Sequence, residues 1–177
     1  MNPFVAPLLR SIEAYQYHRS RVGPWHKLMR RRARLRHMFW SILTQSDVSL
    51  DATLGRGLKL PHPNGVVIHE DAIIGADCMI MQQVTIGMIG DGEVPTVGKN
   101  VYVGAGAKII GKVAVGDGAR IGANAVVIHD VPKGATAVGV PATILAPRSR
   151  RGKSRGRIEP AGPDPSPRRT PRSSSRP

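Results

Sequence analysis

The chain of 177 residues is long enough for one domain with a hydrophobic core. Its single cysteine, Cys78, excludes an internal disulfide framework and fits a reducing compartment. No apolar run approaches the ~20 residues of a membrane span, and the first residues do not resemble a secretory signal. We therefore expect a cytoplasmic protein.

The net charge of +14 is concentrated at the two ends of the chain. Residues 1–46 carry nine Lys/Arg and one acid, and residues 147–177 carry ten and two, so each end contributes +8. Residues 47–146 carry seven bases and nine acids, which gives −2. The charge therefore does not indicate a nucleic-acid-binding domain, and no specific nucleic acid is expected as a partner. Contact of the basic ends with a membrane surface stays open.

Residues 1–46 are expected to form a helical N-terminal segment. Apolar residues recur at near-helical spacing between about Val5 and Thr44, and the second half of this stretch is strongly basic. Pro24 is expected to separate two helices or to open the second one. The apolar positions of the second half are Trp25, Leu28, Met29, Leu35, Met38, Phe39 and Ile42.

Residues 47–146 repeat with a period of six. Thirteen positions in this frame are all aliphatic, and most fifth places of the hexads hold a small residue. A period of six fits neither a helix nor a simple strand. It predicts a mainly β fold, a parallel β-helix whose short strands form the sides of stacked three-sided coils. The thirteen positions are Val48, Leu54, Leu60, Ile68, Ile74, Ile80, Ile86, Val97, Val103, Ile109, Val115, Ile121 and Val127.

Two interruptions of the hexad frame mark the expected functional face. Between residues 60 and 68, two extra residues fall around His62. Between residues 86 and 97, five extra residues must form a loop. Pro61 and Pro63 flank His62 and restrict the backbone on both sides of its imidazole.

Residues 147–177 are rich in Pro, Ser, Gly and Arg and have almost nothing to bury. This composition predicts a disordered basic tail.

The stretches "VIHEDAIIGADCMIMQQVTIG", "VGAGAKIIGKVAVGDGARIGANAVV" and "DVPKGATAVGVPA" resemble the hexapeptide-repeat acyltransferases and, among them, the serine O-acetyltransferases. The resemblance covers about residues 46–142. It implies a left-handed parallel β-helix, acetyl-CoA as the acetyl donor and a homotrimer. Whether two trimers pair stays open.

The resemblance also assigns catalytic roles. It makes His62 the general base and Asp47, fifteen residues earlier, its orienting carboxylate. The pair suits the chemistry, because a hydroxyl is a poor nucleophile at pH 7 and needs an oriented imidazole to take its proton. By the same resemblance, backbone N–H groups near Gly87 and Met88 would hold the oxyanion. No Cys or Ser is placed for an acyl-enzyme, so direct transfer is expected.

CoA would lie in the groove between neighbouring β-helices. Ala105 and Ala123 are small enough to permit its approach, and Lys108, Lys112 and Arg120 are candidates for its phosphates.

The candidates for the acceptor are Asn64, Gln83 and Glu93. No metal is expected, because His62 and His69 have no third imidazole at useful spacing. The five histidines other than His62, including His37 and His69, are expected to be structural or solvated.

The sequence departs from the family where the amino acid would bind. Pro61 replaces the aspartate that precedes the catalytic histidine, and Glu93 and Val94 replace an Arg-His pair. The acceptor is therefore serine or the hydroxyl of a sugar in a polysaccharide precursor. A non-catalytic β-helix that binds anionic partners is the alternative of another class. The tail lacks the family's terminal Ile, so docking to cysteine synthase stays open.

Overall fold

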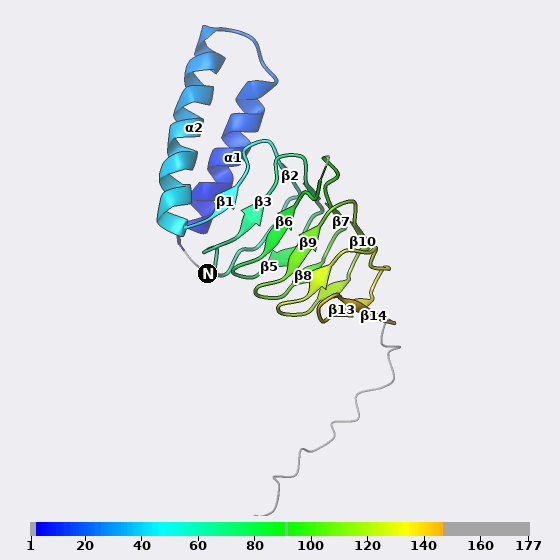
Figure 1. Cartoon of the computed structure of the whole chain (residues 1–177). Helices are drawn as coiled ribbons and strands as arrows, with labels where there is room; N and C mark the ends of the chain where they lie inside the picture. Colours follow the sequence, from blue (N-terminus) through cyan, green and yellow to red (C-terminus); the bar gives the residue numbers. More distant parts are fainter. Residues whose placement is uncertain (1–2, 91, 147–177) are drawn as a thin grey trace, which may run out of the picture.

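The computed structural model describes residues 3–90 and 92–146. Two helices at the N-terminus precede a parallel β-helix, and Figure 1 shows the helices extending beyond its first coil, at the end opposite to β14. The expected mainly β fold with short N-terminal helices is therefore confirmed. The disorder predicted for residues 147–177 falls outside the described residues.

The two helices are α1 (Val5–Arg19) and α2 (Pro24–Thr44). Pro24 opens α2, as expected, because its fixed φ suits the first turn of a helix and its missing N–H is not needed there. Gln45 ends α2 in the left-handed conformation, and its N–H donates back to carbonyls of the last turn. The prediction of two helices divided at Pro24 is confirmed.

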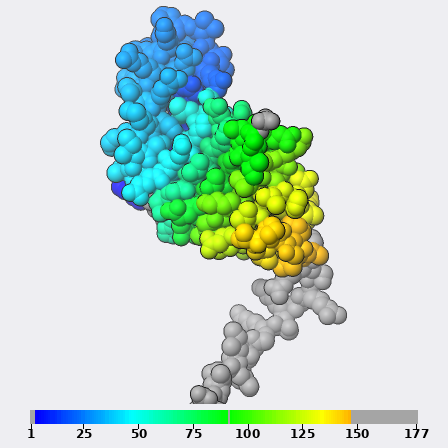
Figure 2. Space-filling view, viewed as in Figure 1, coloured from blue at the N-terminus to red at the C-terminus, as the bar shows by residue number. Residues whose placement is uncertain are grey.

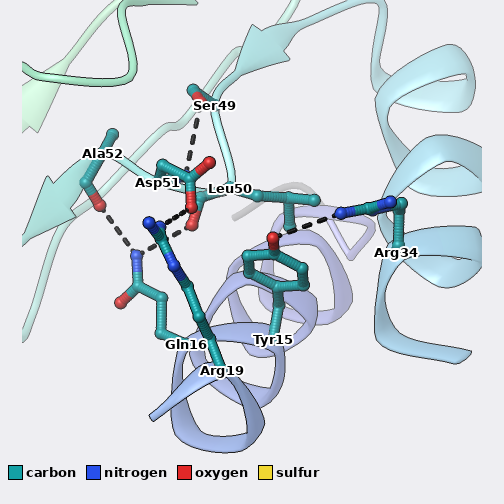
Figure 3. Close-up of polar contacts among 8 residues, drawn as sticks. All are labelled: Tyr15, Gln16, Arg19, Arg34, Ser49, Leu50, Asp51 and Ala52. Atoms are coloured by element: carbon teal, nitrogen blue, oxygen red, sulfur yellow. Dashed lines mark hydrogen bonds and ion pairs between the residues drawn. The ribbon is translucent and has the colours of Figure 1, made fainter. Parts of the chain in front are cut away.

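Helix α1 covers the open end of the β-helix. Val5 and Ile12 join the hydrophobic core of the coils. The side-chain amide of Gln16 donates to the carbonyls of Leu50 (3.0 Å) and Ala52 (2.8 Å), two contacts drawn in Figure 3. Apolar burial and these hydrogen bonds together anchor the helices on the first coil.

Within the described residues, fourteen short strands form the three sides of the β-helix. The first side has the order β1-β3-β6-β9-β12, the second β10-β7-β4-β2, and the third β14-β13-β11-β8-β5. The strands are β1 (Asp47–Val48), β2 (Thr53–Leu54), β3 (Val67–Ile68), β4 (Ile73–Ile74), β5 (Met79–Ile80), β6 (Thr85–Gly87), β7 (Thr96–Val97), β8 (Tyr102–Val103), β9 (Lys108–Ile110), β10 (Ala114–Val115), β11 (Arg120–Ile121), β12 (Val126–Val127), β13 (Thr136–Val138) and β14 (Thr143–Leu145).

The hexad positions form the core, as predicted. Twelve of the thirteen aliphatic residues are buried, and Leu54 is partly buried against them. Neighbouring strands from β1 to β13 are parallel, with equivalent hexad positions in register; Ile68, for example, is the partner of Ile86. The aliphatic side chains therefore stack in columns inside the coils.

Residues in the left-handed backbone conformation lie at the corner that leads from the third side into the first. We call this the entry corner; it contains Gln45, Gly65, Gln83, Gly106 and Asn124, all with positive φ. We call the opposite end of the first side, where the chain turns into the second side, the exit corner. The residues at the exit corner include Met88 and Gly111.

Two features were not predicted from the hexads. The β-helix ends in an antiparallel hairpin of β13 and β14, because the chain turns back at Gly139. In addition, the apolar residues of α2 at helical spacing do not pack on the chain's own core. Trp25, Leu35 and Ile42 are all exposed.

Candidate active site

The segment around His62 is a short loop fixed at both ends. Leu60 and Val66 are buried in the core of the coils, and Pro63 between them is buried as well. His62 itself is exposed. The loop therefore presents the imidazole outward at the entry corner and not into the packed interior.

Backbone hydrogen bonds hold this loop between the coils on either side. The N–H of Asp47 donates to the carbonyl of Val66 (2.8 Å), and the N–H of Gln83 donates to the carbonyl of Asn64 (3.0 Å). The stacking of three coils thus brings Asp47, the His62 loop and Gln83 close together, although they are far apart in the sequence.

The Asp47 carboxylate is not bonded to the ring of His62. Within the described residues, no hydrogen bond or ion pair joins the two side chains. Asp47 instead lines a shallow hollow of about 350 Å³ at the base of α2, together with Ser41 and Val67. The dyad remains a prediction.

The carboxylate of Asp47 interacts electrostatically with the imidazole of His37. Its ring is half-buried between the helices, with Nδ1 at 3.2 Å from the hydroxyl of Ser11 and Nε2 at 3.3 Å from that of Ser41. Burial lowers the pKa of His37, and the backbone of Val48 and the carboxylate of Asp47 oppose this shift. The hydrogen bonds between the helices favour a structural role, as the sequence suggested.

The lowered pKa of His37 predicts acid destabilisation. The unfolded chain binds a proton near pH 6.5, whereas the folded chain resists it. The free energy of unfolding should therefore be largest above pH 6.5 and fall as the pH drops through 6.5 toward the folded-state pKa. Urea unfolding at several pH values measures this. In His37→Gln the fall should be shallower, whereas the exposed His129→Gln should keep it; equal slopes in all three proteins would contradict the prediction.

The entry corner brings together several candidates. The ammonium of Lys108 donates to the carbonyl of Gln83 (2.8 Å) and to the hydroxyl of Thr85 (3.0 Å), so it is held over the first side. In the next two coils Ala105 and Ala123 lie at this corner. Their small side chains leave room beside the backbone. Small residues thus lie beside a fixed cation.

Arg120 begins β11 on the third side, next to the corner that leads from the second side into the third. Its guanidinium stacks over the ring of Tyr102, at 4.9 Å from the ring centroid. The two residues line a hollow of about 250 Å³ that also contains Lys59 and Asp77. Arg120 therefore lies beside a different corner from Lys108.

The remaining candidates lie at the exit corner. Gly87 ends β6, and the exposed Met88 begins the loop predicted from the second interruption of the frame. The N–H of Met88 is not a donor in any hydrogen bond of the described residues. Glu93, on the same loop, pairs with Lys112 at 2.8 Å, and this contact raises the pKa of Lys112. Lys112 therefore ties the loop to the next coil.

The structure thus divides the candidates into two groups. His62, Asn64, Gln83 and Lys108 lie at the entry corner, whereas Gly87, Met88, Glu93 and Lys112 lie at the exit corner. The first-side strands separate the two groups along the same chain. One chain does not bring the candidate base and the candidate oxyanion donors together.

Two further side chains near the coils have no assigned role in the chemistry. Cys78 is buried with its sulfur 3.1 Å from the carbonyl of Gly98, and burial raises the pKa of its thiol, so it is a packing residue as expected. Gln82 lies beside Gln83 at the entry corner. Its Oε1 is buried and has no hydrogen-bond partner among the described residues. Residues 3–90 and 92–146 contain no group of three or more metal-ligating side chains.

The comparisons with known proteins agree with the repeat and the fold. Residues 95–129 match the family described as bacterial transferase hexapeptide (six repeats). A serine acetyltransferase from Helicobacter pylori (strain J99) is 45% identical over 127 residues, which are 68% of this chain and 74% of that protein. The chain belongs to the serine acetyltransferase family.

Other members of the family are longer. A Mycobacterium tuberculosis serine acetyltransferase is 41% identical over 76% of this chain, but the match covers only 60% of that protein. A solved serine acetyltransferase in complex with CoA has a TM-score of 0.63 and 37% identity, covering 76% of this chain and 55% of its own. The chain thus spans little more than half of several serine acetyltransferases that it matches.

Proposed function

We propose that this protein is a cytoplasmic serine O-acetyltransferase that moves the acetyl group of acetyl-CoA to the hydroxyl of L-serine. Membership of the serine acetyltransferase family supports the reaction. The observation that carries the proposal is the exposed His62 on a loop fixed by Leu60, Pro63 and Val66. A base on an anchored loop loses little entropy when it is aimed at a substrate.

In the proposed reaction His62 accepts the proton of the serine hydroxyl as the oxygen attacks the thioester carbonyl. Backbone N–H groups at Gly87 and Met88 hold the negative oxygen of the tetrahedral intermediate. When the carbon–sulfur bond breaks, the imidazolium of His62 gives its proton to the departing thiolate. The products are O-acetylserine and CoA, and no covalent acyl-enzyme forms. In this scheme Asp47 orients His62, which requires its carboxylate to turn from the His37 side toward the loop.

The entry corner has the features that a CoA thioester needs. Ala105 and Ala123 leave room for a narrow pantetheine chain beside the backbone. Lys108 supplies positive charge for a phosphate at this corner, and Arg120 supplies a second cation farther along the third side. A solved serine acetyltransferase of similar fold contains CoA.

The proposed active site lies between two copies of the chain, in a homotrimer. His62 at the entry corner and Met88 at the exit corner lie at opposite ends of the first side. If the entry corner of one copy faces the exit corner of its neighbour, base and oxyanion donors meet. Three copies around an axis close this head-to-tail contact into a ring.

The acceptor pocket differs from the expected family pattern. Pro61 precedes His62 without a carboxylate, and the charge of Glu93 is balanced by Lys112. Gln82 Oε1 is buried without a hydrogen-bond partner among the described residues, so its amide must turn outward before it can accept a hydrogen bond from the ammonium group of serine. A comparison of L-serine with other hydroxyl acceptors therefore tests these contacts.

The test measures release of CoA thiol with a thiol-reactive dye, and acetylated product by mass spectrometry. Purified protein with acetyl-CoA and L-serine should give saturable thiol release and O-acetylserine. Release with monosaccharides but not with L-serine would replace the acceptor with a sugar. No release with either would overturn the enzyme assignment in favour of a binding protein.

A further inference from the structure

The outer face of α2 carries an apolar stripe that the chain itself does not cover. Leu28, Leu35 and Ile42 are spaced by seven residues and therefore lie in one row along the helix. Trp25 and Phe39 lie beside this row. All five are exposed, Ile42 by 72% and Trp25 by 63%. A row of large apolar side chains of this length marks an interaction surface.

The same helix is strongly cationic. It contains six Lys/Arg and no acidic residue. Within the described part of the chain, none of these six has a carboxylate within ion-pair distance; Arg19 of α1, by contrast, pairs with Asp51, as Figure 3 shows. The cations of α2 are Lys27, Arg30, Arg31, Arg32, Arg34 and Arg36.

Charge and apolar surface meet in one hollow. A depression of about 580 Å³ runs along α2, with Leu28 and Leu35 as its apolar part and Lys27, Arg30 and Arg31 among its cations. A ligand for this surface must be apolar and anionic at once. In the space-filling view of Figure 2 the helices form a projecting part of the surface, so a flat partner can approach them.

The charges argue against two other partners. Packing α2 against α2 of a second copy would place six cations against six, with no acid in either helix to pair with them. Nucleic acid would neutralise the arginines but would leave Leu28, Leu35 and Ile42 without an apolar partner. A bilayer with anionic headgroups satisfies both requirements, because acyl chains cover the apolar row while phosphates meet the cations.

We propose that α2 lies flat on a membrane surface that contains anionic phospholipid. Trp25, Leu28, Leu35, Phe39 and Ile42 enter the boundary between headgroups and acyl chains. Lys27, Arg30 and Arg31 contact the lipid phosphates, whereas Arg34 stays against Tyr15 of α1. The helix does not cross the bilayer: among the described helices, none is long and apolar enough to do so.

The experiment follows binding of the full-length protein to vesicles by flotation and by tryptophan emission. Phosphatidylcholine vesicles with about 30 mol % phosphatidylglycerol should bind the protein, and pure phosphatidylcholine vesicles should not. Arg30→Gln/Arg31→Gln and Leu28→Ser/Leu35→Ser should each weaken partitioning about 10-fold, since every cation near an anionic surface and every buried apolar group adds to binding. Raising NaCl from ~0.1 to ~0.5 M should also release the protein.

Matched controls separate α2 from the rest of this basic chain. Lys99→Gln/Lys133→Gln removes two charges from the β-helix, and Ile73→Ser/Ile128→Ser removes two exposed apolar groups there; both should bind like the parent protein. Binding should shift the emission of Trp25 to shorter wavelength, and Trp25→Phe, which keeps Trp40, should abolish the shift.

Two outcomes would overturn the proposal. One is unchanged vesicle binding in both α2 variants, which would assign the affinity to the basic residues 147–177. The other is light scattering that shows Leu28→Ser/Leu35→Ser dissociating an oligomer while vesicle binding persists, which would assign the face to a second copy. Because binding is measured without substrates, neither outcome depends on the proposed reaction.

Discussion

Replacing His62 with alanine is expected to lower kcat/KM for acetyl transfer to L-serine by about 10³-fold. The imidazole is exposed on a loop anchored by Leu60 and Val66, so its removal leaves the core intact while the hydroxyl loses its proton acceptor. The KM for acetyl-CoA should change little, because the loop does not hold the donor. Initial rates of thiol release with both substrates varied measure these constants.

The matched control for this prediction is His129→Ala. His129 is also an exposed histidine on the β-helix. It lies at the exit corner two coils away from Met88 and far from the His62 loop, so its replacement should leave kcat/KM unchanged. Unfolding of both variants should match the parent. A His62→Ala protein that is folded and keeps more than a tenth of the parent kcat/KM would rule out the imidazole as the base.

Asp47 is tested separately, as a positioning residue. In the structure its carboxylate acts on His37 and is not bonded to His62. If it orients His62 during turnover, Asp47→Asn should lower kcat and change the pH dependence of kcat, with less effect on KM. A change in stability alone, without a change in the pH profile, would limit Asp47 to the contact between α2 and β1.

The fold was predictable because a single rule governs the repeat. An aliphatic residue every six positions fills the inside of each side, and twelve of these thirteen residues are buried. The same frame showed where the chain leaves the regular coil, and the loop containing His62 and the loop that begins at Met88 are both found there. The start of α2 was predictable from Pro24 alone, because a proline at the first helical position loses no hydrogen bond.

The arrangement of the candidate site was less predictable. Placing Glu93 on the loop was a local inference, but its ion pair with Lys112 depends on the contact between successive coils. Packing at the entry corner likewise buries Oε1 of Gln82 without a hydrogen-bond partner among the described residues. The hexads also gave no sign that α2 would turn its apolar row outward, because helical spacing identifies a face without saying what covers it.

The largest expected effect on stability comes from a glycine at a corner where coils touch. A methyl group on Gly75 would lie 2.6 Å from the carbonyl carbon of Gly98 and 2.8 Å from the N–H nitrogen of Lys99. These are backbone atoms, fixed by the spacing between coils, so they cannot move aside as a flexible side chain would. Gly75→Ala should therefore lower the free energy of unfolding by about 3 kcal/mol. Urea unfolding at equal protein concentration measures the change.

Gly87→Ala is the matched control, because it adds the same methyl group to the same kind of coil. There the nearest atom is the Cγ2 of Thr85 at 3.6 Å, which is an ordinary van der Waals contact. Its free energy of unfolding should stay within about 1 kcal/mol of the parent. Equal destabilisation by the two substitutions would contradict close stacking as the cause, because only Gly75 lies against backbone atoms of the next coil. A selective loss in Gly75→Ala would show that close stacking of successive corners sets the spacing of the coils, and with it the positions of His62 and Met88.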